Sequence, residues 1–143
     1  MRVINQKDVV LCDFGEGIGS EQRNIRPALI VSNNLNNAFS DIIIVCPITS
    51  RNKKELPTHH SLSKDDYDFF KRENNIVLCE QIRCVSRERL GMILGSINDS
   101  DWKSVLEKVK INFSQIEVFS WKGINNVFNF NSDWCKYWKV GLL

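Results

Sequence analysis

One arginine of this chain stands where a polar loop meets an apolar run. Arg26 follows the mainly polar residues 19–25 and precedes the sequence Pro27–Val31. A guanidinium carries five N–H donors in a rigid fork that matches the oxygens of a phosphate, and a strand behind it fixes its direction. We therefore expect Arg26 to be the centre of the chemistry, with a phosphate as the group that it holds.

Four ordered blocks of sequence carry a family resemblance. They are Asp8–Phe14, Gly19–Asn33, Pro47–Ser50 and Val77–Arg83. Together they resemble the MazF/PemK family of ribonuclease toxins, and the likeness covers roughly residues 4 to 112. The resemblance implies a mainly β protein with a C-terminal helix, built as a small SH3-like antiparallel barrel of the CcdB/PemK-type toxin fold. It also implies a homodimer that cuts single-stranded RNA, most often mRNA, and is inhibited by a cognate antitoxin.

The chemistry that the resemblance implies needs no metal ion. The 2′-hydroxyl of RNA attacks the adjacent phosphorus, which requires a base, an acid for the leaving 5′-oxygen and donors for the developing charge. In the family an arginine and a threonine at the places of Arg26 and Thr49 form the catalytic pair. Arg26 suits the stabilising and acidic roles, because arginine stays protonated. Glu21 could orient the guanidinium or act as the base, for which water and the phosphate itself are alternatives.

Further polar residues of the four blocks are candidate contacts to RNA. They are Ser20, Gln22, Asn33, Ser50 and Gln81. Glu80 and Arg83 flank Gln81 in an otherwise apolar segment, where buried polar groups need partners, so we expect them to brace the structure. A basic loop follows Thr49, and it could either guide an RNA backbone or be a solvated run of charge. That loop contains Arg51, Lys53 and Lys54.

Histidine and cysteine offer weaker signals. His59 and His60 are adjacent, so on a strand they point to opposite faces and cannot act on one phosphate together. Five cysteines are scattered without metal-ligand or disulfide spacing, and we expect small buried side chains in a reducing compartment. We expect no metal ion and no cofactor.

Short runs rich in β-branched residues, separated by Gly, Asn, Asp and Ser, predict six strands. The predicted strands span residues 8–14, 26–32, 41–49, 58–62, 75–80 and 82–86. Their close spacing favours an antiparallel sheet curled toward a barrel. A short helix is predicted from Ser63 to Phe70, and a longer one over about residues 100–117, whose apolar stripe should close one side of the barrel. The stripe consists of Trp102, Val105, Leu106, Val109, Phe113 and Ile116.

The sequence predicts a barrel domain over residues 1–113 and a C-terminal extension over residues 114–143. The extension holds seven of the fourteen Phe, Trp and Tyr residues and falls outside the family resemblance. So many large aromatic side chains do not favour a solvated tail. We expect them to pack on the barrel or on the dimer mate, with stacking on RNA bases as the alternative.

Composition is that of an ordinary globular protein. Of 143 residues, 43% are hydrophobic and 25% are charged. The apolar runs are far shorter than the ~20 residues of a membrane span, and residues 1–15 lack a signal-peptide pattern, so we expect a cytoplasmic protein with no membrane contact. A net charge of +2 means that RNA would bind at a local patch.

Two alternatives to the ribonuclease are a small-barrel module that poisons gyrase and a relative that has lost catalysis. Small barrels carry unrelated functions, so the fold alone does not decide. The presence of both Arg26 and Thr49 favours the enzyme.

Overall fold

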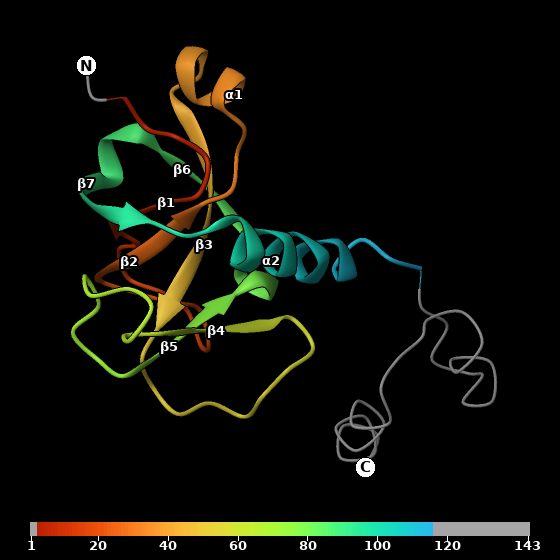
Figure 1. Cartoon of the computed structure of the whole chain (residues 1–143). Coiled ribbons are helices and arrows are strands. Elements are labelled where there is room, and N and C mark those ends of the chain that lie inside the picture. The colour runs from red at the N-terminus through yellow and green to blue at the C-terminus, as the bar shows by residue number, and fades with distance from the viewer. Residues whose placement is uncertain (1–2, 116–143) are drawn as a thin grey trace.

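The computed structural model describes residues 3–115 of the 143-residue chain. In chain order its elements are β1 (Asp8–Asp13), β2 (Ile25–Ile30), α1 (Asn34–Phe39), β3 (Ile42–Thr49), β4 (His59–Ser63), β5 (Asn74–Leu78), the 3-10 helix η1 (Cys79–Gln81), β6 (Arg83–Ser86), the 3-10 helix η2 (Arg87–Arg89), β7 (Leu90–Ser96) and α2 (Asp99–Ile111). Figure 1 shows the long strand β3 running from α1 at one end of the molecule to β5 and β4 at the other.

The strands form an antiparallel sheet in the order β4-β5-β3-β2-β1-β7, and β6 pairs with the first half of β3. Within the described residues β4 and β7 are the strands at the two ends of this order. They do not pair with each other, so the sheet is open. The predicted mainly β fold with a C-terminal helix is confirmed, whereas closure into a barrel is wrong. Val105 and Val109 of α2 pack in one apolar cluster with Val9 of β1 and Leu62 of β4. Helix α2 therefore covers one side of the core, as its apolar stripe predicted.

Both faces of the central strands are buried. Val9 and Leu29 belong to the cluster that α2 covers, whereas their neighbours Val10 and Ile30 belong to a second cluster on the other face. Adjacent strand residues point to opposite faces, so this alternation explains why the strands read as continuous apolar runs. The sheet that carries Arg26 is thus held rigidly from both sides.

Helix α2 begins as predicted and ends earlier. The Asn98 side chain caps it by accepting the Asp101 N–H at 2.8 Å. The predicted stripe is buried at Val105 and Val109, but the helix ends at Ile111, and Phe113 is 74% exposed. Ile116 and the extension over residues 114–143, apart from Ser114 and Gln115, lie outside the described residues.

Residues 64–73 form turns, so the helix predicted from Ser63 to Phe70 is wrong. Its aromatic residues are used in packing instead: the rings of Phe69 and Phe70 lie 4.8 Å apart, and Phe70 also meets Tyr67 edge to face. A Cβ built on Gly95 would lie 2.4 Å from the Phe69 ring. The ring therefore lies directly on the backbone of β7, which the sequence analysis did not predict as a strand.

The turn before β1 is built with Lys7 at φ 77°, a left-handed conformation that favours glycine. From sequence, a lysine at this position predicts a turn without positive φ, and this prediction is wrong. Asn24, before β2, also has a positive φ of 65°. The side-chain Nζ of Lys7 lies 2.6 Å from Asp99, which joins this turn to the first turn of α2.

Cysteine burial follows the prediction at three of the four described positions. Cys12, Cys46 and Cys79 are buried free thiols, and Cys84 is exposed. Burial raises the pKa of Cys12 to about 11, so this thiol stays protonated and behaves as a small apolar side chain. No helix in residues 3–115 is long and apolar enough to cross a membrane.

Candidate active site around Arg26

Arg26 lies at the start of β2, and the preceding loop holds its guanidinium. Nε donates to the Arg23 carbonyl oxygen at 2.8 Å, and Nη1 donates to Oε1 of Gln22. Gln22 is only 8% exposed although it belongs to a polar loop. Two of the three guanidinium nitrogens are thus fixed by the protein, which leaves three of the five N–H groups, both of Nη2 and one of Nη1, for a ligand.

Three arginines gather around this point. Burial lowers the pKa of Arg26, and the positive charges of Arg51 and Arg23 lower it further. Arg51 comes from the loop after β3, so two separate segments supply the charges that act on Arg26. Arg26 is half-buried and Arg23 and Arg51 are exposed, and their combined positive charge attracts an anion such as a phosphate.

Thr49 ends β3 and is tied to the same cluster. Its Oγ1 accepts the backbone N–H of Arg51 at 3.3 Å, so Arg51 follows Thr49 in a tight turn and brings its charge to Arg26. Thr49 is 2% exposed. The residue expected to contact phosphate is therefore covered.

Glu21 is placed differently from the expectation. Its carboxylate accepts the backbone N–H of Ile18 at 2.9 Å, which closes a turn within the β1–β2 loop. The side chain that orients Arg26 is the neighbouring Gln22. Adjacent residues of this loop point in different directions, and the sequence could not show which one faces the guanidinium.

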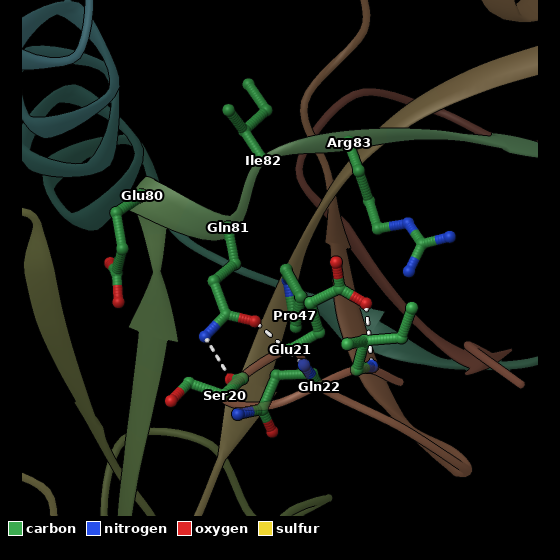
Figure 2. A pocket seen from close by; sticks show the side chains of 9 residues that line it. Ser20, Glu21, Gln22, Pro47, Glu80, Gln81, Ile82 and Arg83 are labelled. Atoms are coloured by element: carbon green, nitrogen blue, oxygen red, sulfur yellow. Dashed lines mark hydrogen bonds between the residues drawn. The ribbon is translucent and has the colours of Figure 1, made fainter. Parts of the chain in front are cut away.

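A cavity of about 480 Å³ opens beside this loop. It is lined by Ile18, Ser20, Glu21, Gln22, Pro47, Glu80, Gln81, Ile82 and Arg83. In Figure 2 Gln81 reaches from η1 to the loop, and Arg83 lies on the other side of the cavity. The guanidinium of Arg83 also lies over the ring of Phe14, 5.5 Å from its centre, so it has the bracing role expected of it. Carboxylates, amides and apolar side chains together suit a nucleobase, which has a flat face and polar edges.

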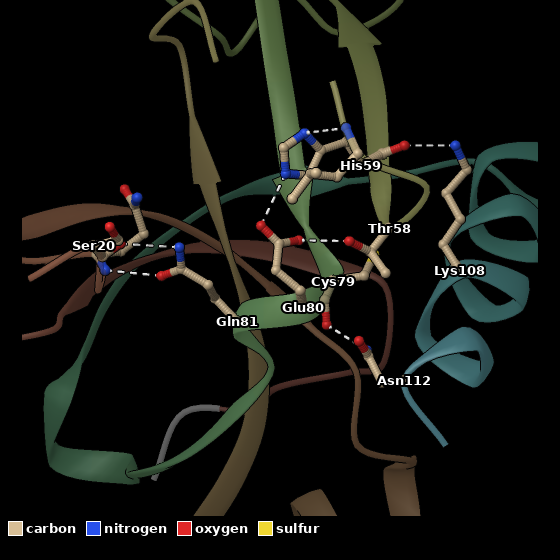
Figure 3. A network of polar contacts seen from close by, with 10 residues as sticks. Ser20, Thr58, His59, Cys79, Glu80, Gln81, Lys108 and Asn112 are labelled. Carbon is tan, nitrogen blue, oxygen red and sulfur yellow. Dashed lines mark hydrogen bonds and ion pairs between the residues drawn. The ribbon is translucent and has the colours of Figure 1, made fainter. Parts of the chain in front are cut away.

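Glu80 is part of an internal network, as predicted (Figure 3). His59 Nε2 lies 2.8 Å from one carboxylate oxygen, and the Thr58 hydroxyl donates to the other at 3.0 Å. Nδ1 of His59 accepts the Leu56 N–H at 3.3 Å, which places the ring proton on Nε2. His60 points to a different partner, Asp101, at 2.8 Å, so the two histidines do face apart.

Comparison with known proteins identifies the chain at this point. Residues 5–113 match the model of the PemK-like, MazF-like toxins of type II toxin-antitoxin systems. The chain belongs to this PemK/MazF family. The relatives and solved structures described next match this chain over almost their whole length.

Two of the PemK/MazF relatives are named endoribonucleases. MazF of Staphylococcus saprophyticus is 35% identical over 121 residues, which make up 84% of this chain and 99% of that protein. EndoA of Bacillus subtilis is 32% identical over 116 residues, 80% of this chain and 98% of that protein.

Among solved structures, MazF from Deinococcus radiodurans has a TM-score of 0.68 at 24% identity and covers 79% of this chain and 98% of its own. A mycobacterial endoribonuclease in complex with its cognate antitoxin has a TM-score of 0.64 at 20% identity, with 80% and 98% covered. These likenesses show that the fold is that of the MazF structures.

The remaining predicted site residues divide into two groups in this PemK/MazF chain. Ser20, Gln22 and Gln81 meet at the cavity, and Ser50 is exposed beside Thr49. Asn33 lies beyond the far end of β2, where its side chain caps α1 by accepting the Asn36 N–H at 2.9 Å. The structure does not bring Asn33 to Arg26.

Two contributors to the site were missed from sequence. Arg23 was not singled out, although its carbonyl and charge both act on Arg26. His59 fixes Glu80 through a contact across 21 residues of sequence, for which no local pattern exists. In residues 3–115 no three His, Cys, Asp or Glu side chains are grouped so that they could hold a metal ion.

Proposed function

We propose that this PemK/MazF chain is the toxin of a type II toxin-antitoxin system and acts as an endoribonuclease on single-stranded RNA. The relatives named endoribonucleases support the activity. The observation that carries the proposal is that Arg26 is held at two nitrogens beside two further arginines, with Thr49 tied to the same cluster. Such a cluster suits the charge that develops on a phosphodiester during cleavage.

In the proposed mechanism the RNA 2′-hydroxyl attacks the adjacent phosphorus, and the P–O bond to the 5′-oxygen breaks. The products are a 2′,3′-cyclic phosphate and a 5′-hydroxyl. Nη2 of Arg26 donates to the phosphate oxygens as negative charge grows on them. Burial and the neighbouring cations lower the pKa of Arg26, which favours transfer of a proton to the leaving oxygen.

Thr49 takes a supporting role in this proposal. Its hydroxyl hydrogen donates to a phosphate oxygen once the segment after β3 has moved. Ser20, Ser50 and the cavity beside the β1–β2 loop are the proposed contacts to the rest of the RNA. Glu21 is 2.9 Å from the Ile18 N–H and remains a candidate base, alongside water and the phosphate itself.

A single cleavage assay tests the proposed function. Purified protein is incubated with a long single-stranded RNA in excess EDTA, and the ends of the fragments are analysed. Specific cuts with 2′,3′-cyclic phosphate ends are expected. Activity that needs added magnesium would contradict the mechanism, and inhibition of gyrase without RNA cleavage would favour the gyrase-poison alternative.

The proposed partners are single-stranded RNA, a cognate antitoxin and a second copy of the chain. An antitoxin with an acidic segment would cover the arginine cluster and exclude RNA.

The proposed dimer interface is apolar and lies on α1 and the start of β3. Leu35, Phe39 and Ile42 are exposed there by 72%, 86% and 47%, as suits a surface that a second copy covers. Light scattering should report twice the 16.6 kDa chain mass. We expect the protein to act in the cytoplasm, where mRNA is found.

We also retain the division into a toxin domain over residues 1–113 and an aromatic extension over residues 114–143. The end of the family match at residue 113 supports this boundary.

A further inference from the structure

Gln81 connects two segments that are about sixty residues apart in sequence. Its Oε1 accepts the backbone N–H of Gln22 at 2.8 Å, and its Nε2 donates to the backbone carbonyl of Ser20 at 3.2 Å. One amide thus holds two backbone groups of the β1–β2 loop, in the way that a neighbouring strand would. Figure 3 shows both bonds on the same side of η1.

The other end of this connection is fixed. Gln81 belongs to η1, where Asn112 after α2 donates to the Cys79 carbonyl oxygen at 2.8 Å. Glu80, between them, is held by His59 and by the Thr58 hydroxyl. Because η1 is fastened to α2 and to β4, it is the rigid partner, and the loop is the segment that is held.

The loop in turn orients the arginine. Gln22, whose N–H is taken by Gln81, offers its own side-chain Oε1 to Nη1 of Arg26. We propose that Gln81 is a positioning residue, which fixes Gln22 and through it the direction of the Arg26 guanidinium. The effect on RNA cleavage rests on the proposed function, whereas the effect on the loop does not.

A different role is open to the same side chain. Gln81 lines the cavity, and its amide retains one N–H and one lone pair after the two loop contacts. As a pure substrate contact it would change RNA binding and leave the loop as it is. The two roles therefore differ in what happens to the Gln22 amide when no RNA is present.

The first measurement is hydrogen exchange of the Gln22 amide in the full chain without RNA. In Gln81→Ala this amide should exchange about tenfold faster or more, because its acceptor is lost. Gln6→Ala is the matched control, since it removes another glutamine-to-backbone bond, Nε2 to the Val31 carbonyl at 2.9 Å, away from the loop. It should leave the Gln22 amide unchanged. An unchanged Gln22 amide in Gln81→Ala would overturn the proposal, whether or not the protein cuts RNA.

The second measurement is a double-mutant cycle on RNA cleavage. Gln81→Ala and Gln22→Ala should each lower kcat by about tenfold with little change in KM, and the double variant should be no slower than the slower single variant, because both act through Arg26. Multiplied losses in the double variant, or a raised KM with unchanged kcat in Gln81→Ala, would contradict the positioning role. Gln81→Met is close to glutamine in shape and lacks the acceptor for the Gln22 N–H, so it serves if the alanine variant does not fold, with a similar rise in the same exchange rate expected. An unchanged rate in that variant would overturn the proposal.

Discussion

Two polar networks of this chain are built from similar hydrogen bonds but differ in their roles. The network of Arg26 consists of Gln22, Arg23 and Gln81, and the charges that act on Arg26 are positive. The network of Asp101 consists of His60, Tyr67 and Asn98, and there the carboxylate accepts from both ring side chains. The first network carries positive charge, and two of its members, Gln22 and Gln81, line a cavity, whereas the second uses its carboxylate within the protein.

The difference separates the proposed binding site from a network that stabilises the fold. Asp101 joins β4, the turns after β4 and the first turn of α2, so the energy of its bonds stabilises the fold. Around Arg26 the fold instead keeps like charges together, which costs stability and favours an anionic ligand. Variants of the two networks should therefore change different measured quantities.

Replacement of Arg26 should have the largest effect. Arg26→Ala removes the charged donor at the phosphate and should lower the rate of RNA cleavage by about 10² to 10³. Thermal stability should hold or rise slightly, because a partly buried charge beside two cations is removed. Arg72→Ala, at an exposed arginine between β4 and β5, is the control. A normal rate in Arg26→Ala would show that the site lies elsewhere.

Asp101→Ala should give the opposite pattern. It leaves the His60 ring and the Tyr67 hydroxyl without their acceptor, and the free energy of unfolding should fall by about 2 to 3 kcal/mol. Cleavage per folded molecule should be unchanged. Asp99→Ala, at an exposed residue of the same helix turn, should leave the melting temperature nearly unchanged. Loss of activity in folded Asp101→Ala would mean that the two networks are coupled.

Alkaline pH should weaken the Asp101 network in a smaller, graded way. Burial and the hydrogen bond to Asp101 raise the pKa of Tyr67 to about 12, from 10.0 in an ordinary tyrosine. A raised pKa in the folded state means that the stabilisation is complete below pH 10 and is lost as pH rises through 12. Unfolding curves between pH 9 and 12 should show a steeper loss in the wild type than in Tyr67→Phe. Equal slopes would show that ionisation of Tyr67 does not cause the loss of stability at alkaline pH.

Much of the fold was readable from sequence because local signals agreed with the tertiary structure. Apolar runs marked β1 to β6, and Asn98 followed by acidic residues marked the start of α2. Strand β7 was missed because Gly91 and Gly95 interrupt its sequence, and glycine weakens the strand signal. The turn at Lys7 was misjudged because tertiary contacts hold a lysine in a conformation that its own preference disfavours.

The candidate site, too, could be predicted from sequence only in part. A fork-shaped donor at a loop-to-strand junction made Arg26 the candidate, and the family pattern paired it with Thr49. In the structure Arg51 is hydrogen-bonded to Thr49 and its charge acts on Arg26. The partner of Arg26 could not be predicted, because Glu21 and Gln22 are neighbours and only the loop conformation selects Gln22. The role of Gln81 depends on contacts some sixty residues away, which no local pattern reports.

The close contact between Phe69 and Gly95 limits the order in which this sequence can change. A Cβ at position 95 would meet the Phe69 ring at 2.4 Å, and that ring is itself held against Phe70. A larger residue at 95 is tolerated only after position 69 has become smaller, whereas a smaller residue at 69 leaves a cavity that one at 95 can later fill. The two positions should therefore vary together among descendants of this chain, with the change at 69 arising first.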